Sequence, residues 1–243
     1  MPLITLIIGT RPEAIKLAPV IKAFFNSRNF NVRILLTGQH REMVYQVLDL
    51  FNIKANYDLE LMTQDQTLTH ITCSSLLGLE EDFKSKKPDL VFVQGDTSSA
   101  FSGCLAAFYN KIPIAHVEAG LRTDDKSNPF PEEVNRRLIS QIADLHFAPT
   151  EKAKLNLINE GIKENIFVTG NTVIDALMSI SDNVKLPKIN NLNWGSGKVI
   201  LVTVHRRENW GINLENIVKA IQKIAQEIKD IYFLIPMHKN KKV

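Results

Sequence analysis

Three acidic residues in this sequence occupy positions where a carboxylate can do chemistry. Asp96 follows a short apolar run after a single glycine, Glu118 follows another such run directly, and Glu132 closes the loop that Glu118 opens. Carboxylates that face one cleft can remove a proton at one centre and deliver a proton at another. Asp96 and Glu132 also have structural interpretations, as a helix cap and as a residue that favours a helix N-terminus. Glu118, at the end of a buried run, is harder to explain in that way.

Two basic residues, Arg11 and Lys16, follow the first apolar run of the chain. Between that run and Lys16, Thr10 and Pro12 are typical of the start of a helix. A helix N-terminus has free backbone N–H groups, so with two cations nearby it predicts an anion site. The alternative is that both cations only lie on the surface. The glycine-rich fingerprints of P-loop and dinucleotide-binding proteins are absent from the sequence.

A second basic cluster begins at His205, which ends an apolar run and precedes Arg206 and Arg207. Guanidinium groups bind phosphate through paired hydrogen bonds, so this cluster is typical of a phosphate site. Taken alone, His205 could be a packed loop histidine. His40 follows the second apolar run and is also placed for a ligand contact. Cations opposite carboxylates would hold an anionic leaving group, which favours chemistry on a phosphorylated sugar.

The elements that position these residues follow from alternating apolar runs and amphipathic stretches. The apolar runs predict strands at Leu3–Ile8, Val32–Thr37, Leu90–Gln94, Ile112–Val117, Leu145–Ala148 and Ile166–Val168. The stretches between them predict helices at Pro12–Asn26, Glu42–Phe51, Leu68–Lys86, Ser98–Asn110, Glu132–Ala143 and Glu151–Glu160. Most runs are continuous, which indicates strands covered on both faces of a doubly wound parallel α/β sheet. Ligands of such sheets bind beyond the carboxyl ends of the strands, where Asp96 and Glu118 lie.

The domain organisation changes after residue 170. We expect a first domain over residues 1–170 and a second over residues 171–243, with a loop at Leu186–Gly197, where Pro, Asn and Gly are frequent. The second domain begins as β-α-β, with strands at Val199–Val204 and Ile231–Ile235 and a helix at Leu214–Lys229. One such unit cannot cover both faces of a sheet, so we expect this domain to be incomplete.

Composition places the chain among ordinary soluble globular proteins. Its 243 residues are 44% hydrophobic and 23% charged, with a net charge of +3. No stretch gathers cations and aromatic residues as a nucleic-acid site would, and no run is long enough for a signal peptide or a membrane span. The histidines lack metal spacing, so no metal is expected. Cys73 and Cys104 are expected to be reduced and buried. These features predict a cytoplasmic protein.

Seven ordered motifs give the chain a family likeness. They resemble those of the bacterial non-hydrolysing UDP-N-acetylglucosamine 2-epimerases, in one order over essentially the whole chain. The motifs are GTRPEAIK (Gly9–Lys16), TGQHREM (Thr37–Met43), GDT (Gly95–Thr97), HVEAGLRT (His116–Thr123), PFPEEVNRR (Pro129–Arg137), FVTGNTVIDAL (Phe167–Leu177) and VTVHRREN (Val202–Asn209).

This resemblance implies the GT-B architecture, in which two Rossmann-like domains face a cleft, and a homodimer. It also implies interconversion of UDP-GlcNAc and UDP-ManNAc for cell-surface polysaccharides, by anti elimination of UDP and its re-addition through a 2-acetamidoglucal, without a cofactor. By motif position, the catalytic residues would be Asp96, Glu118, Glu132 and His205. The substrate-binding residues would be Arg11, Lys16, Gln39, His40, Arg122, Arg136 and Arg206.

The chain departs from the family pattern in two respects. Asp124 stands where relatives usually have Gly, and Asn128 where they usually have Ser, which predicts a modest effect on the loop. Full-length members continue well beyond Val243, so the sequence resembles a truncated product. Two alternatives to a working epimerase therefore stay open. One is an inactive remnant that binds UDP-sugars weakly, and the other is a hydrolysing relative that releases ManNAc.

Overall fold

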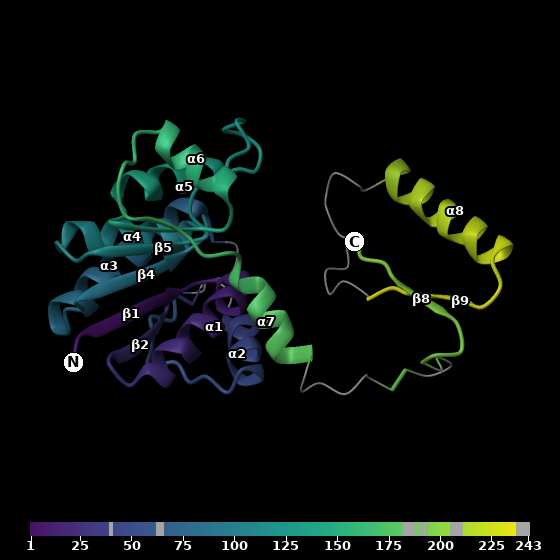
Figure 1. The fold of residues 1–243 in the computed structure, drawn as a ribbon, viewed down its shortest axis with the longest axis horizontal. Helices are drawn as coiled ribbons and strands as arrows, with labels where there is room; N and C mark the ends of the chain where they lie inside the picture. Colours follow the sequence, from purple (N-terminus) through teal and green to yellow (C-terminus); the bar gives the residue numbers. More distant parts are fainter. Residues whose placement is uncertain are drawn as a thin grey trace. The chain divides into compact units, whose positions relative to one another are not determined.

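The computed structural model describes residues 1–38, 41–61, 66–181, 188–189, 192, 194–204 and 211–236. It contains two compact units, Met1–Asn183 and Val184–Val243, which are described separately. The division falls later than the boundary expected at residue 170. The reason is helix α7 (Thr172–Ser181), which packs beside α1 (Arg11–Ser27) and buries Ala176 in the core of the first unit (Figure 1).

The first unit is built on one parallel sheet of seven strands, in the order β3-β2-β1-β4-β5-β6-β7. The strands are β1 (Leu3–Ile8), β2 (Asn31–Leu36), β3 (Tyr57–Asp58), β4 (Leu90–Gln94), β5 (Ile114–Val117), β6 (Leu145–Ala148) and β7 (Ile166–Val168). The other helices are α2 (Arg41–Leu50), α3 (Leu68–Ser85), α4 (Ser98–Tyr109), α5 (Glu132–Ile142) and α6 (Glu151–Asn159). The sequence pattern missed β3, because a two-residue strand has no apolar run.

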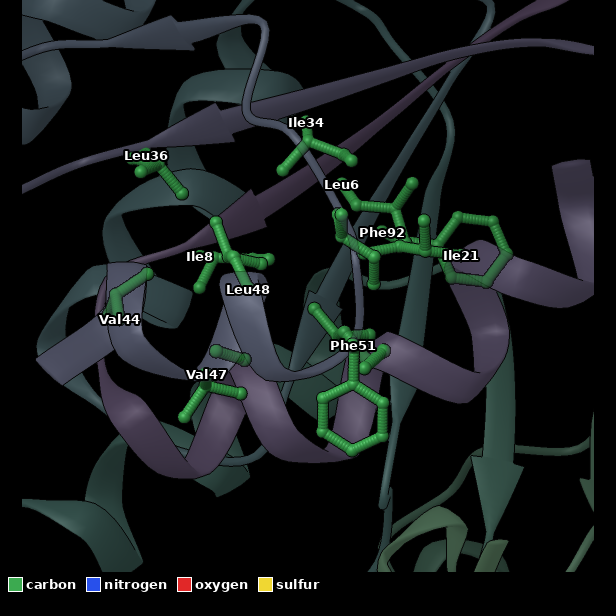
Figure 2. Close-up of a cluster of buried hydrophobic side chains, with 14 of the residues drawn as sticks. Leu6, Ile8, Ile21, Ile34, Leu36, Val44, Val47, Leu48, Phe51 and Phe92 are labelled. Carbon is green, nitrogen blue, oxygen red and sulfur yellow. The ribbon is translucent and has the colours of Figure 1, made fainter. Parts of the chain in front are cut away.

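Both faces of the central strands are covered, as the continuous apolar runs predicted. Alternate residues of a strand point to opposite faces of its sheet. Accordingly, Leu6 and Ile8 pack in one core cluster with α1 and α2, whereas Ile7 packs in the other with α3, α4 and α5. Figure 2 shows the first cluster, in which side chains of β1, β2 and β4 meet those of α1 and α2. The predicted doubly wound α/β fold is thus confirmed.

The order of the strands reverses between β1 and β4. From β1 the chain proceeds through α1 to β2 on one side, and from β4 it proceeds through α4 to β5 on the other. The helices of these two connections lie on opposite faces of the sheet. Such a switch point opens a crevice beyond the carboxyl ends of the strands, where α/β proteins bind their ligands. The loops after β1, β4 and β5 border this crevice.

The second unit contains a parallel pair of strands, β8 (Lys198–Leu201) and β9 (Ile231–Leu234), joined through α8 (Ile212–Glu227). This matches the β-α-β pattern expected there. One smaller expectation was wrong: Cys104 is buried, but Cys73 is exposed on α3. None of the helices among the described residues combines the length and the apolar character needed to cross a membrane.

Candidate active site at the carboxyl edge of the sheet

Glu118 lies directly after β5 and accepts hydrogen bonds on both carboxylate oxygens. Its Oε2 accepts from Lys16 Nζ at 2.5 Å and from Gln94 Nε2 at 2.6 Å, and its Oε1 accepts from Asn171 Nδ2 at 2.9 Å. The Glu118 side chain is only 10% exposed. Its backbone φ is +67°, a left-handed conformation that non-glycine residues adopt at a cost in free energy. A carboxylate kept in a strained backbone position points to a functional site.

Asp96 lies in the neighbouring loop, after β4. Its Oδ2 accepts a hydrogen bond from Arg136 Nη2 at 2.5 Å, and its backbone oxygen accepts one from Asn135 Nδ2 at 2.9 Å. Burial raises the pKa of Asp96 above its usual value, although Arg136 opposes the rise. The negative charges of Glu118 and Glu132 raise this pKa further, which means that all three carboxylates share one electrostatic environment.

Glu132 is the first residue of α5 and is half-buried. Within the described part of the chain, its carboxylate forms no hydrogen bond or ion pair, unlike those of Asp96 and Glu118. The three predicted carboxylates therefore lie together in three different environments: one held by three donors, one paired with arginine and one free.

The buried residue Glu13, which the sequence analysis did not select, joins two of these loops. Its Oε2 accepts from the backbone N–H groups of Gly9, at 2.7 Å, and Thr10, at 2.5 Å, while its Oε1 accepts from Thr97 Oγ1 at 2.5 Å. Burial raises the pKa of Glu13, and these hydrogen bonds partly offset the rise. Glu13 thus ties the loop after β1 to the loop after β4, which carries Asp96.

His116 lies in β5 and holds the same loop through a hydrogen bond. Its Nε2 lies 2.7 Å from the backbone oxygen of Gly95, the residue before Asp96. Because that oxygen is an acceptor, Nε2 must carry the proton and donate it. Burial lowers the pKa of His116 to about 3, so the ring is neutral near pH 7. His116 therefore has a structural role.

Of the basic residues predicted to bind substrate, Lys16 and Arg136 lie in the cluster, in contact with Glu118 and Asp96. Arg11 begins α1, where it is exposed, and it forms no ion pair within the described residues. Arg122 is not brought to the cluster, since its side chain is 4% exposed and is bonded to Glu160 at the end of α6. The guanidinium of Arg122 is thus engaged by Glu160 and by Ser140.

The loop between β5 and α5 is held by a second ionic network, around Glu133. Hydrogen bonds from Arg137, at 2.9 Å, and from the backbone N–H of Thr123, at 3.1 Å, lower the pKa of Glu133 despite its burial. Asp124 in this loop has a φ of +62°, the conformation that glycine adopts most easily. Asp124, which stands where relatives usually have Gly, thus occupies a backbone conformation that favours glycine.

Four of the predicted site residues, Gln39, His40, His205 and Arg206, lie outside the described residues. Among the described residues, no group of three or more His, Cys, Asp or Glu side chains is arranged to hold a metal ion. What the described part offers is a polar edge with three coupled carboxylates, two cations paired with them and one exposed arginine at a helix N-terminus.

Comparison with known proteins identifies the family. A family model described as UDP-N-acetylglucosamine 2-epimerase matches residues 22–243. The chain belongs to this family. The UDP-N-acetylglucosamine 2-epimerase of Bacillus subtilis is 50% identical over 236 residues, which cover 96% of this chain and 62% of that protein.

Solved structures of the family have the same fold. The UDP-GlcNAc 2-epimerase of Neisseria meningitidis, bound to UDP-GlcNAc, matches with a TM-score of 0.90 and 45% identity over 100% of this chain and 67% of that one. MnaA of S. aureus, in a co-structure with UDP, matches with a TM-score of 0.85 and 47% identity over 100% and 64%. The fold class is therefore α/β and GT-B-like. The chain spans 62–63% of the length of the first curated relatives that it matches.

Proposed function

We propose that this chain takes part in interconverting UDP-GlcNAc and UDP-ManNAc, by anti elimination of UDP and its re-addition through a 2-acetamidoglucal. The observation that carries the proposal is the coupled cluster of Asp96, Glu118 and Glu132 at the carboxyl edge of the sheet, in a member of this epimerase family. Relatives have been solved with UDP-GlcNAc and with UDP bound, which supports the same class of substrate here.

Each half of the proposed reaction balances without a redox step. In the elimination, a carboxylate takes the proton from C2, a double bond forms between C1 and C2, and the C1–O bond breaks with its electron pair leaving on UDP. In the re-addition, a UDP oxygen attacks C1 and a proton is delivered to C2 on the opposite face. Nothing is oxidised or reduced overall, so the proposed reaction needs no nicotinamide.

The environments of the carboxylates suit these steps. The C2 proton is not next to a carbonyl group, so cleavage of the anomeric bond must lead and develop positive charge, which carboxylates stabilise. Burial raises the pKa of Asp96, which favours its protonated form relative to an exposed aspartate and suits it to deliver a proton. Glu132, without a partner in the described part of the chain, is available to accept one. Arg11, Arg206 and His205 supply charge for the diphosphate in this proposal.

The wider setting is proposed on the same grounds. We place the activity in the supply of ManNAc units for cell-surface polysaccharides, in the cytoplasm, and we propose a homodimer.

The proposal is tested by incubating the purified chain with UDP-GlcNAc in deuterated water. Deuterium at C2, observed by NMR and mass spectrometry, is the expected result, and Glu118→Gln should abolish it. Glu151→Gln, which changes an exposed carboxylate on α6, should leave it unchanged and serves as the control. Release of free ManNAc would instead indicate a hydrolysing enzyme. Absence of both exchange and UDP binding would overturn the proposal and leave the inactive remnant.

A further inference from the structure

Asn171 connects the carboxylate of Glu118 to the start of a helix that lies 53 residues later in the chain. It stands between the glycine that follows β7 and the first residue of α7. Its Nδ2 donates to Glu118 Oε1 at 2.9 Å, and its Oδ1 accepts from the backbone N–H of Val173 at 3.1 Å. The first bond orients a site residue, and the second caps α7.

These two bonds determine which way the amide of Asn171 faces. A backbone N–H can only donate, so the atom near Val173 must be the oxygen. The NH₂ group is then directed to Glu118, where a carboxylate can accept it. The cap therefore presents the donor to Glu118, and a rotated amide would lose both bonds. Few residue types can do both: Asp and Ser cap a helix equally well, but neither offers an amide donor.

The carboxylate needs this contact because its other donors meet a single oxygen. Lys16 Nζ and Gln94 Nε2 both bind Oε2, at 2.5 and 2.6 Å. With Oε2 alone bound, the group could still turn about that oxygen. The bond from Asn171 to Oε1 removes this freedom and sets the plane of the carboxylate. Catalysis is sensitive to such orientation, since small misplacements of a reacting group reduce rates strongly.

We infer that Asn171 is a positioning residue for Glu118, which holds the carboxylate in one plane by coupling its Oε1 to the capped start of α7. The catalytic part of this inference rests on the proposed function, whereas the contact itself does not. Among the described residues, the charged groups near Glu118 include Lys16 on α1, Asp96 after β4 and Glu132 on α5, and the test leaves all three in place.

Two substitutions separate the helix cap from the contact with Glu118. Asn171→Ser keeps a cap and removes the donor. Asn171→Asp keeps the cap and the shape of the side chain, but places a second carboxylate against Glu118. A role limited to capping predicts that both variants behave like the wild type, because Ser, Asp and Asn are similarly good N-caps. A positioning role predicts two different departures, since like charges at this distance disfavour ionisation.

The first readout is the carboxyl ¹³C titration of Glu118 in chain labelled at glutamate, assigned by the signal that Glu118→Gln removes. We expect Asn171→Asp to move the titration midpoint of Glu118 upward by one pH unit or more, and Asn171→Ser to move it upward by less. Thermal unfolding of Asn171→Ser should stay close to that of the wild type, whereas Asn171→Asp should unfold at a lower temperature, because a raised folded-state midpoint of Glu118 reduces stability near pH 7. A midpoint that is the same in all three proteins would overturn the inference, whether or not the chain is active.

The second readout is the pH profile of deuterium incorporation at C2. In Asn171→Asp, the rising limb should move to higher pH by the same amount as the NMR midpoint. In Asn171→Ser, the rate should fall at least tenfold while UDP affinity is retained. A wild-type chain that exchanges no deuterium would count against the proposed function only. A shifted NMR midpoint with an unchanged exchange profile would show that Asn171 contacts Glu118 without positioning it for catalysis, and would overturn the inference.

Discussion

The neutral, buried state of His116 makes a quantitative prediction about stability in mild acid. Burial lowers its pKa in the folded chain to about 3, from an ordinary value of 6.5. Its Nε2 donates to Gly95, and its Nδ1 is buried without a hydrogen-bond partner in the described structure. Protonation would therefore bury a charge and an unpaired N–H, so between these pH values the unfolded chain binds the extra proton.

The sign and size of the effect follow from linkage. Because the unfolded state binds more protons in this window, the free energy of unfolding is largest above pH 6.5 and falls as the pH drops toward 3. For these two pKa values, the His116 contribution lost between pH 7 and pH 5 is about 2 kcal/mol. For a chain of this size, that loss lowers Tm by roughly 4–8 °C.

The matched variant is His116→Gln, because the glutamine amide can reach the Gly95 oxygen but does not titrate. Urea denaturation followed by circular dichroism at pH 5 and pH 7 should show that the wild type loses about 2 kcal/mol more than the variant. Glu13, Asp82 and Asp96, whose pKa values burial raises, act in the opposite direction, but they are present in both proteins and cancel in the difference. Equal losses in the two proteins, or an NMR titration of His116 with a midpoint above 6, would refute the reasoning.

Three further substitutions test the site and its supports. Asp96→Asn should abolish deuterium exchange at C2 while UDP affinity stays within a few-fold, as measured by exchange NMR and calorimetry; retained exchange would exclude Asp96 from the chemistry. Glu13→Gln should lower the free energy of unfolding by about 1–3 kcal/mol in urea titrations, because an NH₂ group would face the donors of Gly9 or Thr97; an unchanged midpoint would mean that these contacts do not stabilise the loops. Asp124→Val should be destabilising by about 1–2 kcal/mol in the same assay, since its φ is +62°, whereas Asp124→Gly should be nearly neutral.

The sequence pattern predicted the central strands because they are buried on both faces. Almost every residue of β1 and β4 is apolar, so the sequence shows a continuous apolar run even when the neighbouring strands are not known. The edge strand β3 has two residues and no such run, so it was missed. The first compact unit extends past residue 170 because α7 packs on α1, a contact between residues far apart in the chain.

The sequence could predict only those site residues that directly follow a predicted strand. Asp96 and Glu118 follow buried strands, and the rule for parallel sheets places them at one edge. Glu13 and Asn171 were missed, because their contacts with Thr97 and Glu118 join residues 84 and 53 positions apart. The Thr10–Glu13 spacing is that of a capping box, so it could have drawn attention to Glu13. The ion pair of Arg122 could not be predicted either, since Glu160, which binds it, lies 38 positions away.

Three similar carboxylates acquire different properties from these remote contacts. Glu118 accepts hydrogen bonds from three side-chain donors, which fix its carboxylate in one orientation. Asp96 is buried beside two other negative charges, which favours its protonated form relative to an exposed aspartate, even with Arg136 at 2.5 Å. Glu132 forms no hydrogen bond or ion pair with the described residues, so no contact among them fixes its orientation. A reaction that removes a proton on one face and returns it on the other requires groups that differ in this way, because identical carboxylates in one pocket would compete for the same proton.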